Sequence, residues 1–181
     1  MPLLILGLLI WAGAHMFKRL APGPRAAMGE RGKAVVTVAL LVSLGLMVIG
    51  YRGAEGAVFW GRSPALVGIN NLLMLVSVYL FAAAGMKTAV AQRMRHPMLT
   101  GVIVWAVAHL LVNGDVPSFV LFGGMAVWAV LEMAMINRAQ PGWVPPRGKG
   151  AKMEVMAAVG TLLVYGAIAG AHIALGYPTF G

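Results

Sequence analysis

The sequence predicts an all-α integral membrane protein with six transmembrane helices, short loops and both termini on the outer, periplasmic side. Three observations lead to this prediction. Apolar residues make up 60% of the 181 residues and charged residues only 10%, whereas a soluble domain carries about 25% charged residues. Six apolar runs are long enough, or nearly so, to cross a bilayer. The basic residues gather in alternate loops between these runs.

Turn-forming residues separate the six apolar runs. Glycine, proline and asparagine favour turns and interrupt helices, and they cluster at residues 22–24, 61–64, 96–97, 113–115 and 141–146. The expected helices therefore cover residues 2–17, 34–51, 65–86, 98–112, 117–136 and 153–175.

The first and third expected helices each carry one informative feature. No Lys or Arg precedes Lys18, so the first run lacks the basic segment of a cleaved signal peptide, and we expect it to be a retained helix. Asn70 and Asn71 are polar residues near the start of the third helix. Hydrogen bonds to a neighbouring helix are the favoured interpretation of this pair, and the lining of a cavity is the alternative.

The fourth and fifth helices are expected to form a tight antiparallel hairpin, because only a few residues separate them. Asp115 suits the N-cap of the fifth helix and Pro117 suits its first turn. In the last helix, Gly166 and Gly170 form a GxxxG pattern. Together with Gly160, this pattern predicts a smooth face for close helix packing.

The basic residues determine the predicted orientation. The first, third and fifth loops hold five, three and four of the fourteen Lys and Arg residues, and only Arg52 and Arg62 lie elsewhere. The positive-inside rule therefore places the odd loops in the cytoplasm and both termini outside. The same distribution explains the net charge of +9 without nucleic-acid binding. Because the loops are too short for a soluble domain, residues 1–181 are expected to form one multi-pass transmembrane domain.

The candidate functional residues are the four histidines, His15, His96, His109 and His172. An ionisable side chain at membrane depth is costly and is a functional candidate, and imidazole is a common metal and heme ligand. Trp11 precedes His15 by four residues, as Trp105 precedes His109, so each indole shares a helix face with an imidazole. This aromatic wall suits a porphyrin edge. Alternatively, the tryptophans are interior packing and the histidines bond to neighbouring helices.

The expected depth of each histidine in the membrane suggests other partners than the two Trp–His pairs do. His15 and His96 lie toward the cytoplasmic ends of their helices, whereas His109 and His172 lie toward the outer ends, at about 1.5 Å per residue. Pairing His15 with His109 therefore needs helix tilt or a thinned membrane. His96 precedes Pro97, where a role in starting the helix competes with ligand binding. The absence of cysteine excludes disulfides, iron–sulfur clusters and thiolate-bound heme.

Several of these segments together resemble the NnrU family of bacterial membrane proteins. The most specific block is residues 95–115, which contains the Arg-His-Pro start and the Trp105–His109 pair. Weaker matches lie at residues 13–15, 21–22 and 46–51 and at His172. The resemblance covers nearly the whole chain. It implies a multi-pass protein of the bacterial inner membrane, linked by its denitrification gene clusters to nitrite and nitric oxide metabolism.

The NnrU family is related to 15-cis-zeta-carotene isomerase, a membrane heme b protein with two histidine ligands. Carried over by motif, this relationship implies that His15 and His109 bind the iron of heme b. Trp11, Trp105 and His96 are the other cofactor-binding candidates. The implied function is a bis-histidine heme protein that acts as a redox or accessory component. Membrane lipid and other membrane redox proteins are the implied partners.

The sequence leaves three alternatives open. One is heme-dependent carotene isomerisation, although the isomerase has a cysteine three residues before its second histidine, where this chain has Ala106. Another is an S-adenosylmethionine-dependent membrane methyltransferase, because residues 95–101 also resemble the cofactor segment of isoprenylcysteine carboxyl methyltransferases, with Glu132 as their acidic residue. The third is an accessory protein without chemistry, in which Glu132 pairs with a basic residue such as Arg138.

Overall fold

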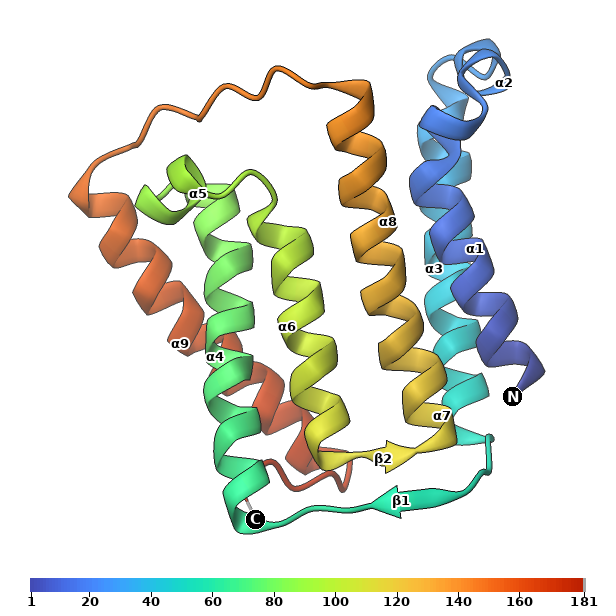
Figure 1. Cartoon of the computed structure of the whole chain (residues 1–181), viewed down its shortest axis with the longest axis vertical. Coiled ribbons are helices and arrows are strands. Elements are labelled where there is room, and N and C mark those ends of the chain that lie inside the picture. The colour runs from blue at the N-terminus through green and yellow to red at the C-terminus, as the bar shows by residue number, and fades with distance from the viewer. Residues whose placement is uncertain (181) are drawn as a thin grey trace.

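All six apolar runs are helical in the computed structural model, which describes residues 1–180 (Figure 1). Helix accounts for 77% of the structure, which confirms the predicted all-α class. The fifth run is one continuous helix with three parts, α7, η1 and α8. The bounds of the long elements are α1 (Pro2–Leu20), α3 (Arg31–Arg52), α4 (Pro64–Met86), α6 (Pro97–Val112), α7 (Val116–Ser118), η1 (Phe119–Gly123), α8 (Gly124–Ala139) and α9 (Ala151–Ala174).

Among residues 1–180, five helical runs are long and apolar enough to cross a membrane. The exception is α6, whose 16 residues rise about 24 Å, less than the hydrocarbon core of about 30 Å. Figure 1 shows α6 between α4 and α8. Because protein flanks this short helix on both sides, its ends are less exposed to lipid than those of an outer helix.

Four short elements were not expected from the sequence. Two of them are helical, α2 (Pro22–Ala27) and α5 (Ala89–Arg93), and two are strands, β1 (Val58–Trp60) and β2 (Gly114–Asp115). The strands pair antiparallel, and the indole of Trp60 donates to the Leu110 carbonyl at 3.0 Å. A Cβ at Gly114 would lie 2.3 Å from the Trp60 ring, so only glycine permits this contact. The pair of strands covers the C-terminal end of α6.

The predicted start of the fifth helix is confirmed. Asp115 is the N-cap of α7 and accepts from the Ser118 backbone at 2.8 Å. Pro117 lies in the first turn. The Ser118 hydroxyl donates to Asp115 at 3.0 Å, and the Tyr51 hydroxyl lies 2.8 Å from the same Ser118 oxygen. This chain of hydrogen bonds joins α3 to the cap. The predicted role of Asn70 is also confirmed, since its amide donates to the Ala108 carbonyl of α6 at 2.7 Å.

Glycines bring α1 and α3 into close contact. A Cβ at Gly7 would lie 2.9 Å from the carbonyl oxygen of Ser43, and a Cβ at Gly50 would lie 2.3 Å from the nitrogen of Leu4. Both positions would overlap backbone atoms, which cannot move aside as a flexible side chain can. Small residues at a helix crossing allow this approach inside a membrane.

The predicted packing face on the last helix is wrong for this chain. Within residues 1–180, no atom of another part of the chain lies within 4 Å of a Cβ built at Gly166 or Gly170. Gly160 has one methyl group at 3.8 Å. The motif identifies a smooth surface but not what lies opposite it. Instead, α9 packs on α4, and its buried residues are Ala157, Thr161 and Ala169.

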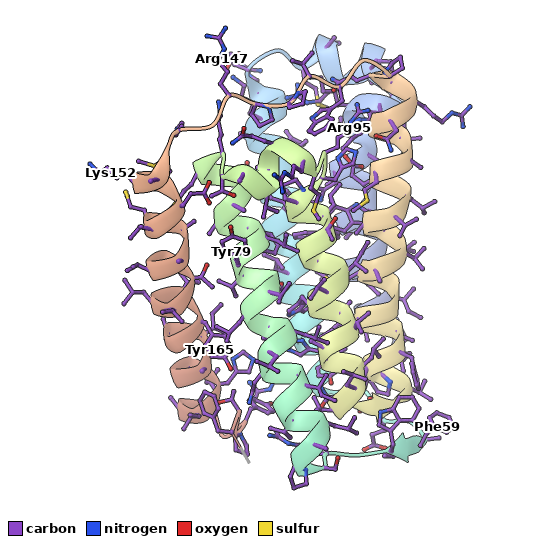
Figure 2. The ribbon with its side chains drawn as sticks, turned by 60° about the vertical axis from the view of Figure 1, so that its left-hand side comes forward. Phe59, Tyr79, Arg95, Arg147, Lys152 and Tyr165 are labelled. Carbon is purple, nitrogen blue, oxygen red and sulfur yellow. The ribbon has the colours of Figure 1, made fainter. Side chains whose placement is uncertain are left out.

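Charge and aromatic side chains separate along the bundle. Figure 2 shows Arg95, Arg147 and Lys152 at one end and Phe59 at the other. The first helix begins, and the last helix ends, toward the end where β1 and β2 lie (Figure 1). The structure therefore has a basic end, next to α2 and α5, and an aromatic end near both termini.

Candidate functional site

A cavity of about 1070 Å³ brings the predicted site residues together. All four histidines line it, although they come from α1, from α9 and from both ends of α6. The five cofactor-binding candidates from the sequence are all part of its wall: Trp11, His15, His96, Trp105 and His109. The remaining wall is mainly apolar and comes from α3, α4, α5, α6, α8, α9 and the segment that precedes α9.

His15 is held by its own helix. Its Nδ1 lies 3.0 Å from the carbonyl oxygen of Trp11. A carbonyl only accepts, so Nδ1 carries a proton, and in the neutral imidazole the lone pair is on Nε2, which has no hydrogen-bond partner within residues 1–180. The imidazole centroid lies 4.4 Å from the Trp11 ring and 4.7 Å from the Trp128 ring of α8. Metal-binding histidines commonly donate their second nitrogen to a backbone carbonyl in this way.

His109 repeats the same arrangement on α6. Its Nδ1 lies 2.9 Å from the Trp105 carbonyl oxygen, which again leaves Nε2 free. The imidazole stacks on Phe122, with a centroid distance of 4.6 Å and an interplanar angle of 27°. Phe122 belongs to the π-helical segment η1, and such segments are frequent at functional sites. The wider π turn therefore contributes an aromatic surface next to the imidazole.

The side chains of His15 and His109 are inclined in opposite directions along the bundle, which reduces the distance between their rings along this axis. Each ring lies over the preceding turn of its own helix, because its Nδ1 bonds to the carbonyl four residues earlier. Figure 1 shows that α1 and α6 run in opposite directions. The inclination toward each helix N-terminus therefore moves His15 away from the basic end and His109 toward it. This geometry reduces the difference in depth that the sequence suggests for the pair.

The other two histidines differ from each other. His172 resembles the first two, since its Nδ1 lies 2.8 Å from the Ile168 carbonyl oxygen. In His96 it is Nε2 that is engaged, at 2.8 Å from the Asn137 side-chain oxygen. His96 occupies the N-cap position of α6 but makes no side-chain cap bond. Its ring thus bridges α6 and α8 at the basic end of the cavity.

Glu132 forms the polar part of the cavity wall on α8. It is 6% exposed and forms an ion pair with Arg19 of α1. The expected pairing of Glu132 with a basic residue is confirmed, but the example Arg138 was wrong, because six residues along a helix rotate the side chain by about 240°. Trp128 lies one turn before Glu132 and is also 6% exposed.

Three residues near the site, Trp128, Phe122 and Arg19, were not predicted from the sequence, whereas Glu132 was. Trp128 and Glu132 have the four-residue spacing that marked the two Trp–His pairs, so this spacing was an available signal. Phe122 and Arg19 meet the site only through contacts between helices, and no sequence pattern indicates them.

The donor set fits a cofactor that needs two protein ligands. Within residues 1–180, the structure does not bring three His, Asp or Glu side chains together as a metal site requires. Two imidazoles with free Nε2 atoms line one apolar cavity instead. Two axial imidazoles are a complete protein ligand set for heme iron.

The comparison with protein families identifies this chain. The family model described as NnrU protein matches residues 3–179. No curated protein and no solved structure matches the chain. The chain belongs to the NnrU family, as its resemblance indicated, and the match includes all six long helical runs.

Proposed function

We propose that this NnrU protein binds heme b in the cavity, with His15 and His109 as the two axial ligands. The observation that carries the proposal is the shared state of these two imidazoles. Each donates Nδ1–H to the carbonyl four residues before it, and each keeps Nε2 free at the wall of one cavity. Because their helices run in opposite directions, the inclination of each side chain toward its own helix N-terminus reduces the difference in depth between them.

The surroundings of the two histidines support a flat, apolar cofactor. Aromatic rings flank both imidazoles, with Trp11 and Trp128 next to His15 and Phe122 next to His109. Aromatic faces pack favourably on other flat rings. The absence of cysteine in the chain leaves imidazole as the strongest iron ligand that the cavity wall offers.

The heme would supply one-electron redox chemistry. With His15 and His109 both holding the iron, a small molecule would reach it only after one imidazole had left. This favours electron transfer or a redox-gated exchange of ligands. We therefore propose a redox or accessory component linked to nitrogen-oxide metabolism, with other membrane redox proteins as partners. The link to nitrogen oxides rests on the family resemblance alone.

The proposed setting is the bacterial inner membrane, crossed six times with α6 as the short span. The basic end near Arg95 and Arg147 would face the cytoplasm by the positive-inside rule. Both termini would then be periplasmic. Contacts of α6 with α4 and α8 support a short span, because neighbouring protein replaces lipid around its ends.

The alternatives receive less support from the site. The methyltransferase interpretation rests on the short segment 95–101 and on Glu132, one oxygen of which is already paired with Arg19. The isomerase interpretation has Ala106 in place of the cysteine, and Ala106 is fully buried. A product assay on a cis-carotene would separate an isomerase from a heme protein of another function.

An optical spectrum of the purified protein, expressed with ample heme, tests the proposal. We expect a Soret band that shifts on reduction, and we expect its loss in His15→Ala and in His109→Ala. His96→Ala and His172→Ala are the matched controls and should keep the band. A wild-type protein without a Soret band would refute heme binding. A band that depends on His172 and not on His15 would refute the ligand assignment.

A further inference from the structure

Three buried polar atoms of the cavity wall have no hydrogen-bond partner within residues 1–180. They are the indole nitrogens of Trp11 and Trp128 and the second carboxylate oxygen of Glu132. All three residues line the cavity, and Trp128 and Glu132 are each only 6% exposed. Buried polar groups nearly always have partners. Their coincidence on one cavity wall points to a ligand that supplies the missing hydrogen bonds.

The three groups lie close together, which defines the ligand's chemistry. The rings of Trp11 and Trp128 are 5.4 Å apart at an angle of 82°, and Glu132 follows Trp128 by one turn of α8. The ligand must therefore accept from two indole N–H groups and donate to one carboxylate. A hydroxyl or a carbonyl and hydroxyl together can do both. A second ionised carboxylate has no hydrogen to donate, so it would leave the Glu132 oxygen without a partner.

The cavity is continuous with the apolar surface of the bundle. Among the well-exposed residues of its wall are Leu44 at 43%, Val164 at 50% and Ile168 at 37%. They belong to α3 and α9, which have their main contacts with other helices and not with each other. Exposed apolar side chains within membrane spans face lipid. A molecule dissolved in the bilayer can thus reach this cavity from the side.

We propose that the end of the cavity next to Trp11, Trp128 and Glu132 binds the head group of a membrane-soluble quinol or its quinone. A flat ring packs against the two indoles. Its hydroxyl donates to Glu132, its oxygens accept from the indole N–H groups, and its tail extends into the lipid. The cavity volume of about 1070 Å³ is at the top of the range for one small ligand. This inference goes beyond the iron proposal and needs no metal.

Equilibrium binding of short-chain quinones to the full-length protein in detergent micelles tests this inference. The probes are decylubiquinol, decylubiquinone and decanol, which has a hydroxyl but no flat ring. We expect saturable binding of both quinone forms and none of decanol. Trp128→Phe should weaken both forms by about three- to tenfold, the effect of one lost hydrogen bond. Glu132→Gln should weaken the quinol about tenfold more than the quinone, because only the quinol donates to a carboxylate.

Matched controls are Trp60→Phe and Glu30→Gln, which alter the same residue types away from the cavity wall. Equal losses in a control and its cavity variant would overturn the inference, as would decanol binding as tightly as the quinol. If Trp128→Phe does not fold, the quinol-to-quinone ratio in Glu132→Gln still decides. An intact Soret band without quinol binding removes this inference alone. Quinol binding without a Soret band removes the iron proposal alone.

Discussion

The two Trp–His pairs have the same local hydrogen bond but different surroundings. His15 and His109 each bond to the carbonyl four residues earlier. Around His15 lie Trp128 and, farther along α8, the ion pair of Glu132 with Arg19. Around His109 lie aromatic rings, with Phe122 stacked on the imidazole. One site is thus near charge, and the other is enclosed by packing.

This difference separates what the helix determines from what the fold determines. The hydrogen bond to the carbonyl four residues earlier sets the tautomer of each imidazole. The backbone of a single helix is therefore enough to orient the ring as a metal ligand. The polarity around the ring comes from other helices. We therefore expect the His109 end to depend on the volume of its neighbours and the His15 end to depend on their charge.

The largest effect is expected for Phe122→Ala at the His109 end. Phe122 is 5% exposed, and removing a buried phenyl ring costs about 3–5 kcal/mol. Thermal unfolding in micelles, followed by circular dichroism, measures the loss. Phe59→Ala is the control, because Phe59 is 63% exposed and should change stability by less than about 0.5 kcal/mol. Equal losses at the two positions would show that packing does not distinguish the His109 end.

A somewhat smaller effect is expected for Arg19→Met at the His15 end. The substitution leaves the buried carboxylate of Glu132 without its partner, which costs about 3 kcal/mol, the lower end of the range for buried pairs. The lower end applies because the Arg19 side chain is still 29% exposed. The control is Lys33→Met, which breaks an exposed ion pair with Glu30 worth about 0–1 kcal/mol. Similar losses in both variants would mean that the His15 end does not depend on buried charge.

The smallest effect is expected for His96→Ala, which belongs to neither pair. The change removes one hydrogen bond to Asn137, worth about 1 kcal/mol. Asn137→Ala should cost a similar amount, and the double variant should cost no more than either single one, since all three remove the same bond. Unfolding midpoints of the three variants measure this cycle. Additive losses would show that the two side chains act independently.

Much of the fold follows from the sequence because long helices of this kind can be recognised by their runs of apolar residues. Six apolar runs, the Asp115 cap and the Asn70 hydrogen bond to α6 were all predicted. The paired strands and the π-helical segment were not. They contain only two to five residues each, and contacts with distant residues such as Trp60 and Leu110 stabilise them. Such contacts leave no periodic pattern in the chain.

The glycines also show that a local motif does not identify the helix that packs against it. The GxxxG pattern at Gly166 and Gly170 suggested a packing face, but the close contact lies at Gly7 and Gly50, which form no motif. A motif describes one surface, whereas packing needs two. The candidate site divides in the same way. The Trp–His spacing predicted each pair within its helix, but the opposing Trp128 became evident only when α8 was placed against α1.

The placement of the cavity wall has a consequence for biosynthesis. His15 enters the membrane with the first helix, and His109 arrives only with α6, since a chain emerges from the ribosome N-terminus first. The wall that contains Trp128 and Glu132 follows with α8, and Ile168 and His172 follow last with α9. A chain interrupted after α6 would have both imidazoles and no enclosure around them. The cavity is therefore a late product of membrane insertion, completed only when the last helix joins the bundle.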